Sequence, residues 1–400
     1  ISGSKNASLP ILAATLLSNK KIYLKTLPKV KDIETMIVLL ESLGSKIKRI
    51  KDKISIDNSN QKKTFASYNL VKTMRGSILV LGPLLAKFKK AKVSSPGGCT
   101  IGVRPIDIHL KALSKLGVNY KIDQGYVIAS APKGLIGAKI RFPKISVGAT
   151  ENLIIAASFA KGTTYLSNCA IEPEIKDLVN FLKKMGCNIK WATKRSIKIV
   201  GVTEVRETNY TVMFDRIEAG TYMVAAAVTE GNLKIKSIIP SIIKTEINVL
   251  RNIGAKISCK KNEIHIIGNK KIKSVNIRTA PYPGFPTDLQ AQIMVLLCKA
   301  NKKSIIKEEI FENRFMHVAE LNRMGAQIST EGNKAIINGN IKFQSAELMA
   351  TDLRASVSLI LAALVSKGRS VINRIYHLDR GYEDIEKKMK KIGAKIRRID

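Results

Sequence analysis

The chain repeats one pattern of apolar and polar positions six times. In each repeat an amphipathic stretch, such as 177–185 or 386–392, ends at a Gly that is followed by alternating apolar residues. Gly tolerates the left-handed backbone that ends many helices, so the pattern predicts a helix, a Gly cap and then a strand. Successive Gly residues lie 73, 69, 68, 71 and 68 positions apart, and they are Gly44, Gly117, Gly186, Gly254, Gly325 and Gly393.

Each repeat also contains an earlier helix of a different kind. Its residues are apolar almost all round and rich in Ala, which predicts a helix buried on every side. The six ranges are 9–17, 77–86, 151–160, 221–228, 289–300 and 355–365. One unit therefore reads as strand, buried helix, strand, exposed helix and two strands.

Six units of this size predict an α/β protein with two globular domains of three units each. Solenoid repeats are shorter, roughly 20–45 residues, whereas three of these units have the ordinary size of a domain. The natural boundary lies near 210–215, and no Pro- or Ser-rich linker marks it. We expect three apolar helices to meet inside each domain, with the sheets packed outside them.

The composition adds a large positive charge. The 400 residues include 68 Lys+Arg and 31 Asp+Glu, a formal net charge of +37. Such a charge can indicate a nucleic-acid partner. However, Lys outnumbers Arg 51 to 17, although Arg is preferred for recognising bases and phosphates. The Lys residues are also spread along the whole chain, with no block of about five or six like charges. We therefore expect no nucleic acid as the main partner and attribute the excess to compositional bias.

Several other classes of protein are disfavoured. No apolar run approaches the ~18 residues that a membrane helix needs, so no membrane insertion is expected. The chain opens without the pattern of a secretion signal. The five Cys form no CxxC pair and the four His show no metal-ligand spacing. These features predict a reduced, cytoplasmic protein without a disulfide scaffold or a metal.

A Gly-rich segment at 94–109 is the first candidate for chemistry. Its glycines would let backbone amides approach a ligand closely, and Cys99 lies among them with Arg104 nearby. A loop thiol near cations can act as an acid or a nucleophile. Equally, most cysteines are inert, small apolar residues, and we expect Cys169, Cys187, Cys259 and Cys298 to be so. For Cys99 the residues alone leave both interpretations open.

The same segment partly matches a phosphate-binding P-loop. Gly97 and Gly102 have the required spacing, but Val103 and Arg104 stand where the motif needs Lys and then Ser or Thr. The Lys that would bind the phosphates is missing, so nucleoside triphosphate hydrolysis is excluded.

The first residues of the buried helices carry polar groups that an apolar helix does not need. Ser, Thr and Asp are ordinary N-caps, which explains any one segment. Lys5, Arg75 and Arg354 are different, because cations are disfavoured at the N-terminus of a helix. The recurrence predicts a cleft for a small ligand with several negative charges. The segments are 4–6, 73–75, 146–150, 215–220, 286–288 and 351–354.

Seven segments closely resemble the UDP-N-acetylglucosamine 1-carboxyvinyltransferases (enolpyruvyl transferases), which share the EPSP synthase fold. They are 4–7, 96–105, 146–151, 215–221, 283–291, 312–315 and 351–354. The resemblance runs essentially end to end. It implies two inside-out α/β barrel domains, each of three βαβαββ repeats, with the active site in the interdomain cleft. The first domain would be 6–212, with the Cys99 loop, and the second 213–400 plus 1–5.

The resemblance also implies a reaction. The enolpyruvyl group of phosphoenolpyruvate moves to the 3-hydroxyl of UDP-N-acetylglucosamine with release of phosphate. This is the first committed step of peptidoglycan synthesis, carried out in the cytoplasm by a monomer without a cofactor. Protonation of C3 makes C2 electrophilic, a base removes the sugar hydroxyl proton, and a tetrahedral intermediate expels phosphate. This chemistry needs one acid, one base and several cations.

Residue roles follow from the resemblance. Cys99 matches the proton donor, which can also form a covalent adduct and is the target of the epoxide fosfomycin, and Asp288 matches the base. The phosphoenolpyruvate contacts are Lys5, Asn6, Arg104 and Arg380. The UDP-sugar contacts are Arg75, Arg104, Pro105, Ile106, Asp107, Ile108, Lys144, Ile145, Ser146, Val147, Asp288 and Ile310. Asp352 and Arg354 match the far wall of the cleft. From the residues alone, Asp288 is interpreted as a helix N-cap and Arg380 as a solvated loop charge.

Two alternatives remain. The sister transferase acting on shikimate 3-phosphate shares the fold but has no such loop Cys. A basic nucleic-acid-binding protein could keep the fold without catalysis, and the presence of Lys5, Cys99, Asp288 and Arg380 disfavours it.

The chain also opens without the strand that precedes Ser-Lys-Asn in the family. That strand would belong to the second domain, so we expect an unpaired sheet edge there and lower stability.

Overall fold

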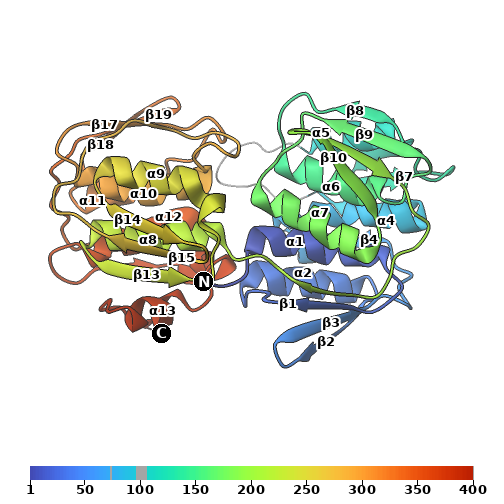
Figure 1. The fold of residues 1–400 in the computed structure, drawn as a ribbon, viewed down its shortest axis with the longest axis horizontal. Helices are drawn as coiled ribbons and strands as arrows, with labels where there is room; N and C mark the ends of the chain where they lie inside the picture. The colour runs from blue at the N-terminus through green and yellow to red at the C-terminus, as the bar shows by residue number, and fades with distance from the viewer. Residues whose placement is uncertain (73, 96–105, 400) are drawn as a thin grey trace. The chain divides into compact units, whose positions relative to one another are not determined.

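A computed structural model describes residues 1–72, 74–95 and 106–399. The chain divides into two compact units (Figure 1). The N-terminal unit holds the described residues of Gly3–Cys99 and Arg104–Met213, and the C-terminal unit those of Ile1–Ser2 and Phe214–Asp400. Residues 3–5, which the sequence-based division gave to the second domain, group with the N-terminal unit. The reason is local, because the Ser4 N–H donates to the Met213 carbonyl at 2.8 Å.

The N-terminal unit is built around three helical segments that are buried on most sides. They are α1 (Lys5–Ala14), η2 (Arg75–Val80) running into α4 (Leu81–Phe88), and α6 (Val147–Ala157). Their Ala-rich, apolar surfaces form one core with the strands around them. The three buried helices predicted for this unit are confirmed, although each begins two to four residues earlier than expected. The outer helices are α2 (Lys31–Ser42), α3 (Tyr68–Val71), α5 (Asp107–Lys115) and α7 (Pro173–Met185), and η1 (Thr15–Leu17) follows α1.

Sheets of four strands surround these helices. Their orders are β12-β1-β3-β2, β4-β5-β7-β6 and β10-β11-β9-β8. Central strands such as β3 and β7 alternate buried and half-buried residues, so one face packs on the helices and the other faces outward. The strands are β1 (Ile22–Lys25), β2 (Lys46–Ile50), β3 (Lys53–Asp57), β4 (Phe65–Ala66), β5 (Lys90–Ser94), β6 (Asn119–Asp123), β7 (Tyr126–Ser130), β8 (Lys139–Arg141), β9 (Thr163–Ser167), β10 (Asn188–Thr193), β11 (Ser196–Val200) and β12 (Thr208–Thr211).

The first sheet is completed by the last strand of the unit. β12 pairs in parallel with β1, with Ile22 opposite Thr208 and Lys25 opposite Thr211. The other two sheets gain their parallel strand locally, from β4 and β8. The chain therefore returns to its own first repeat before it enters the C-terminal unit.

The C-terminal unit repeats the plan with α8 (Arg216–Val228), α10 (Gln290–Cys298) and α12 (Leu353–Leu364) inside. Every residue of α8 and α10 is buried. The remaining helical segments are η3 (Pro240–Ile243), α9 (Lys244–Ile253), η4 (Thr287–Leu289), α11 (His317–Arg323), η5 (Ile375–Arg380) and α13 (Ile385–Lys391). The strands are β13 (Asn232–Lys236), β14 (Lys256–Lys260), β15 (Glu263–Ile267), β16 (Ile277–Arg278), β17 (Ser304–Lys307), β18 (Ile328–Glu331), β19 (Lys334–Ile337), β20 (Glu347–Met349) and β21 (Val371–Asn373).

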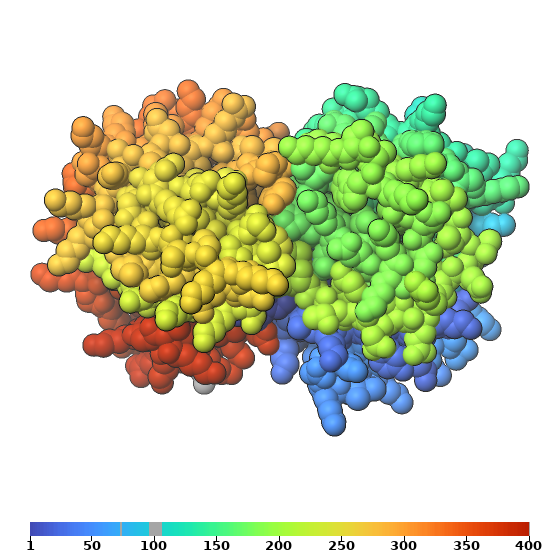
Figure 2. All heavy atoms as spheres, in the orientation of Figure 1, coloured from blue at the N-terminus to red at the C-terminus, as the bar shows by residue number. Residues whose placement is uncertain are grey.

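The predicted Gly caps are confirmed in all six repeats. The Gly residues that follow the exposed helices have φ between 87° and 118°, in the left-handed region. The strand predicted after Gly393 is wrong, because residues 394–399 form none. Backbone groups in a strand need a partner strand, and within the described part of the chain β21 pairs only with β20. In Figure 2 this last segment, in red, lies on the surface of its unit.

Among residues 1–72, 74–95 and 106–399, which the structure describes, no helix is both long enough and apolar enough to span a lipid bilayer.

Candidate active site

Asp288 is held by two buried arginines. Its Oδ1 accepts a hydrogen bond from Arg314 Nη2 at 3.0 Å, and its Oδ2 accepts one from Arg354 Nη2 at 2.9 Å. The two Arg side chains are only 6% and 5% exposed, whereas that of Asp288 is 24% exposed. Charge-assisted bonds to both oxygens fix the plane of the carboxylate. The two guanidinium groups are thus shielded from solvent, whereas the Asp288 carboxylate remains accessible to it.

Glu308 fixes the backbone that carries Asp288. Thr287, the neighbour of Asp288 in η4, donates its hydroxyl to Glu308 Oε2 at 2.8 Å. Glu308 Oε1 accepts from the Thr279 hydroxyl at 2.9 Å and from the Ile310 N–H at 2.8 Å. Glu308 is buried, so these bonds replace its lost hydration. The Glu308 carboxylate therefore links the segment before Asp288 to the backbone of Ile310.

Arg354 is oriented from two directions. It follows Asp352, which caps α12 by accepting from the N–H groups of Arg354 and Ala355 at 2.8 and 3.1 Å. Its Nη1 donates to the Tyr382 hydroxyl at 3.2 Å. Burial alone would lower the pKa of Arg354, but the charge and hydrogen bond of Asp288, together with Tyr382 and Asp215, outweigh that cost and raise it. The guanidinium therefore stays charged although it is buried.

Arg380 ends η5, directly before Gly381 and Tyr382. A Cβ added at Gly381 would lie 2.6 Å from Leu353 Cδ2, so Gly lets this segment pack closely on the Leu353 side chain at the start of α12. Burial and the charge of Arg380 lower the pKa of His377, and Asp352 raises it. Arg380 and Asp352 thus act on the same imidazole. The structure also shows Arg380 to be half-buried rather than the fully solvated charge that the residues alone indicated.

In the N-terminal unit the candidate residues begin helices. Lys5 and Asn6 start α1, and Lys5 Nζ lies 3.2 Å from Asp32 Oδ2 in an ion pair whose side chains are 12% and 7% exposed. Arg75 starts η2. Ser146 caps α6 by accepting from the Ala149 N–H at 3.3 Å. An interior carboxylate, Asp32, thus explains how a cation is held at the start of α1.

Asn152 and His109 bring two candidate segments together. Asn152 Oδ1 accepts from the Gly82 N–H at 2.8 Å, while its Nδ2 donates to the Ile78 carbonyl at 3.1 Å and contacts His109 Nδ1 at 3.2 Å. Because Nδ2 can only donate, Nδ1 accepts and the ring proton lies on Nε2. A Cβ added at Gly148 would lie 3.2 Å from His109 Cε1.

This contact sets the start of α5 beside the start of α6. Candidates on the α5 side are Ile106, Asp107 and Ile108, of which Ile108 is buried and the others half-buried. On the α6 side lie Lys144, Ile145, Ser146 and Val147, of which Lys144 and Val147 are exposed.

Three candidates, Cys99, Arg104 and Pro105, lie outside the described residues. The other cysteines are free thiols. Burial raises the pKa of Cys187 to about 11 and those of Cys169 and Cys298 to about 12, which agrees with the prediction that they are inert. The expectation of burial is wrong for Cys259, which is exposed on β14, an edge strand of the sheet β13-β15-β14.

Several residues of this arrangement had no role in the sequence analysis. Arg314 lies within a segment that carried the resemblance, and that was its only signal. Glu308, Asn152 and Tyr382 had none, because their partners are distant in the chain, and His109 was included only as the last residue of the segment 94–109. Another buried carboxyl, Glu151, follows the α6 candidates. Its burial and the charges of Glu174 and Glu172 raise its pKa well above the usual range.

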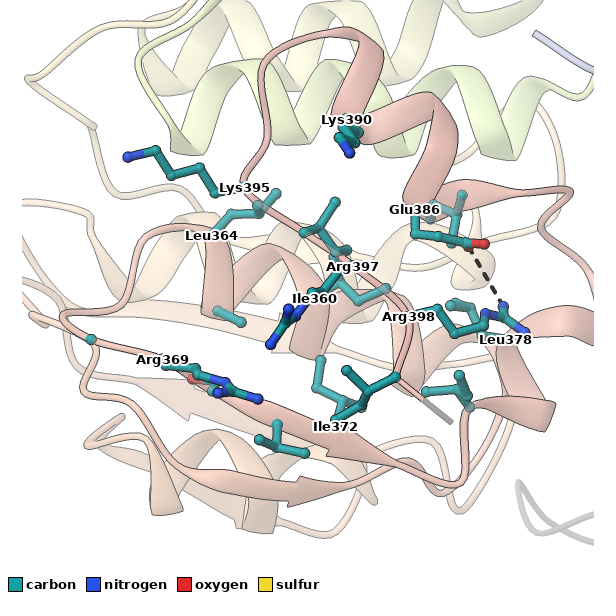
Figure 3. Close-up of a pocket in the computed structure, with 18 residues that line it drawn as sticks. Ile360, Leu364, Arg369, Ile372, Leu378, Glu386, Lys390, Lys395, Arg397 and Arg398 are labelled. Atoms are coloured by element: carbon teal, nitrogen blue, oxygen red, sulfur yellow. Dashed lines mark ion pairs between the residues drawn. The ribbon is translucent and has the colours of Figure 1, made fainter.

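A cavity of about 620 Å³ lies elsewhere in the C-terminal unit (Figure 3). Its walls come from α12, β21, η5, α13 and the last residues of the chain, and they include Arg369, Lys390 and Arg397. Figure 3 shows Arg398 paired with Glu386 at 3.5 Å at one side. None of the candidate site residues lines this cavity. It is therefore distinct from the arrangement around Asp288.

No group of three or more His, Cys, Asp or Glu among the residues that the structure describes is placed to hold a metal ion.

Comparison with known proteins gives concordant results. The family model of EPSP synthase (3-phosphoshikimate 1-carboxyvinyltransferase) matches residues 1–389. A UDP-N-acetylglucosamine 1-carboxyvinyltransferase of Pelagibacter ubique is 76% identical over 400 residues, 100% of this chain and 96% of the relative. One of Geotalea uraniireducens is 51% identical over 399 residues, 100% of this chain and 95% of the relative.

Solved structures agree in fold. The enolpyruvyl transferase NikO of Streptomyces tendae gives a TM-score of 0.90 at 23% identity, covering 99% of this chain and 94% of its own. EPSP synthase of Acinetobacter baumannii gives 0.76 at 18% identity, covering 98% and 95%. At these identities the likeness concerns the fold alone. Together with the family match and the close relatives, it shows that the chain belongs to the EPSP synthase family of carboxyvinyltransferases.

Proposed function

We propose that the protein transfers the enolpyruvyl group of phosphoenolpyruvate to the 3-hydroxyl of UDP-N-acetylglucosamine and releases phosphate. The observation that carries this proposal is the 76% identity, over all 400 residues, to a relative named for this reaction. The sister reaction on shikimate 3-phosphate has weaker support, since the EPSP synthase structure is 18% identical. The proposed reaction is the first committed step of the synthesis of peptidoglycan, a component of the cell wall. We propose that the protein is a monomer and acts in the cytoplasm.

In this proposal Cys99 donates a proton to C3 of phosphoenolpyruvate, which makes C2 electrophilic. Asp288 accepts the proton of the sugar 3-hydroxyl as its oxygen bonds to C2. The resulting tetrahedral intermediate then loses phosphate, and the proton gained at C3 is removed as the double bond re-forms. No electrons are exchanged with a redox partner, so no cofactor is required. The acid and the base each lower the barrier by moving a proton in the transition state.

The surroundings of Asp288 support its role as the base. Each carboxylate oxygen has two lone pairs, and the bonds from Arg314 and Arg354 use one on each oxygen. The carboxylate also remains 24% exposed, so a substrate hydroxyl can reach it. The two fixed cations stabilise the carboxylate in one orientation, which is what a base needs if it must meet a hydroxyl at hydrogen-bond distance.

The other proposed roles follow the resemblance. Phosphoenolpyruvate would contact Lys5, Asn6, Arg104 and Arg380. The UDP-sugar would contact the starts of η2, α5 and α6, together with Asp288 and Ile310. Asp352 and Arg354 would support the site. We further propose that each unit is an inside-out α/β barrel of three repeats, and that the reaction draws on residues of both units.

The test is phosphate release from the two substrates. We expect release by the wild type, and loss of at least about 100-fold in kcat for Cys99→Ala, the order of magnitude of a lost general acid. Cys259→Ala is the matched control, because its thiol is exposed and lies on a strand of the C-terminal unit. Shikimate 3-phosphate in place of the UDP-sugar should give no release. Phosphate release with shikimate 3-phosphate, and none with UDP-N-acetylglucosamine, would contradict the proposal.

A further inference from the structure

The Tyr382 hydroxyl is a buried polar centre behind the Asp288 cluster. The residue is 2% exposed. Three polar atoms lie within hydrogen-bond distance of its oxygen: Arg354 Nη1 at 3.2 Å, Thr221 Oγ1 at 2.8 Å and Gln292 Nε2 at 3.4 Å. These residues come from α12, α8 and α10, the three buried helices of the unit. One hydroxyl therefore contacts a residue from each of these three buried helices.

The direction of these bonds follows from counting donors. Arg354 and Gln292 nitrogens can only donate, so the Tyr382 oxygen accepts from Arg354 and shares one Gln292 proton with Thr221 Oγ1, which lies 3.3 Å from Gln292 Nε2. The Thr221 hydroxyl donates its single proton to the Ile217 carbonyl at 2.9 Å, one turn back in α8. Hence the Tyr382 proton must be donated to Thr221 Oγ1. Burial raises the pKa of Tyr382, although Arg354 lowers it, so the hydroxyl remains protonated and able to donate.

Two of these contacts lead directly to Asp288. Arg354 uses its second terminal nitrogen to bind Asp288 Oδ2 at 2.9 Å. Gln292 Nε2 also donates to the Asp288 backbone carbonyl at 3.0 Å. Tyr382 thus acts on the side chain of Asp288 through one neighbour and on its backbone through another. Its ring lies against the same guanidinium, with Arg354 Cζ 5.5 Å from the ring centroid.

We propose that Tyr382 is a positioning residue for the base of the reaction. Its hydroxyl fixes the Arg354 guanidinium, and the guanidinium in turn fixes the plane of the Asp288 carboxylate. This inference rests on the proposed function, because it takes Asp288 as the group that accepts the sugar proton. Tyr382 itself is buried behind Arg354 and has no part in proton transfer to the substrate.

The proposal predicts how activity is lost. Without the hydroxyl, Arg354 Nη1 loses its acceptor and the guanidinium can rotate while remaining charged. Substrate binding should change little, whereas the chemical step should slow, because small errors in the position of a base are costly. A purely structural hydroxyl would instead lower thermal stability and leave kcat per folded molecule unchanged.

The experiment compares Tyr382→Phe with Tyr222→Phe. Tyr222 is also a buried tyrosine of the C-terminal unit, at 6% exposure, and its hydroxyl has no hydrogen-bond partner in the described structure. Phosphate release and thermal unfolding are measured for both. For Tyr382→Phe we expect kcat to fall about 10-fold or more, with KM for both substrates within about 2-fold. Tyr222→Phe should keep wild-type kcat.

A second pair of variants keeps the test decisive if Tyr382→Phe folds poorly. Thr221→Val removes the acceptor of the Tyr382 proton, whereas Thr221→Ser keeps a hydroxyl at that position. We expect the valine variant to lose kcat and the serine variant to recover it. A wild-type kcat in Tyr382→Phe would overturn this inference but not the proposed function. A loss of kcat in Tyr222→Phe equal to that in Tyr382→Phe would do the same. A wild type that releases no phosphate from the two substrates would instead overturn the proposed function.

Discussion

Arg354 and Asp288 are joined across 66 positions of the chain by a hydrogen bond of 2.9 Å between Nη2 and Oδ2. The cation is 5% exposed and the carboxylate 24% exposed. This asymmetry matters, because a fully exposed pair would contribute little and a fully buried one would hide the carboxylate from substrate. The pair combines a rigid cation with an accessible base.

Replacement of Arg354 by Lys should therefore be far from conservative. A lysine ammonium cannot present two directed donors to Asp288 and Tyr382 at once. We expect kcat/KM for phosphate release to fall by about 100-fold, and the free energy of unfolding by about 3 kcal/mol, as for other broken buried pairs. Arg278→Lys is the control, since Arg278 pairs with Glu309 on the surface. Equal activity of the two variants would contradict the role assigned to Arg354.

The regular parts of the fold could be predicted because their signals are local. Apolar residues on all sides of a helix dictate burial wherever the helix packs, and the Gly residues that end the exposed helices need no distant partner. The strand after Gly393 fails for the opposite reason. Its alternation is local, but a strand forms only when another strand supplies hydrogen bonds.

The site was only partly predictable for a similar reason. From the residues alone Asp288 is a helix cap, yet in the structure η4 has no side-chain cap and the carboxylate binds Arg314 and Arg354. Glu308 and Tyr382 act through partners in other elements, so no spacing in the sequence marks them. The resemblance pointed to Asp288 itself, but it carried no information on how this chain orients the side chain.

His317 should make stability depend on pH. Burial lowers its pKa from the ordinary 6.5 to about 4; the nearby Asp352 raises it and Arg314 lowers it. Between these two values the unfolded chain binds a proton that the folded protein excludes, so stability falls as the pH drops from about 6.5 towards 4. At about 1.4 kcal/mol per pKa unit, the loss is at most about 3.5 kcal/mol.

Urea unfolding of the wild type and His317→Gln at several pH values checks this. Because glutamine does not titrate, the variant should lose less stability than the wild type over that window. Other buried acids titrate in both proteins and cancel in the difference. Parallel curves for wild type and His317→Gln would refute the assignment.

Asn152 should be one of the most sensitive polar positions of the N-terminal unit. Asn152→Leu would remove the acceptor of the Gly82 N–H and the donor to His109, while the Ile78 carbonyl would keep its bond from the Leu81 N–H. Each buried group left unsatisfied costs about 1–3 kcal/mol, so we expect a loss of about 3 kcal/mol or more in the free energy of unfolding. Asn188→Leu, at an exposed strand position, is the control. A similar urea midpoint for both would show that the network contributes little.

The thiols should separate into three groups by reactivity. Reaction requires the thiolate and access, and burial raises the pKa of Cys187 to about 11 and those of Cys169 and Cys298 to about 12. We expect these three to resist iodoacetamide in the folded protein, whereas the exposed Cys259 reacts. Fosfomycin should discriminate further. Its phosphonate resembles a substrate phosphate, so its epoxide should alkylate Cys99 and spare Cys259. Peptide mass spectrometry of wild type and Cys259→Ser locates the adducts. A fosfomycin adduct on Cys259, or none on Cys99, would contradict the proposed role of Cys99 as the reactive thiol.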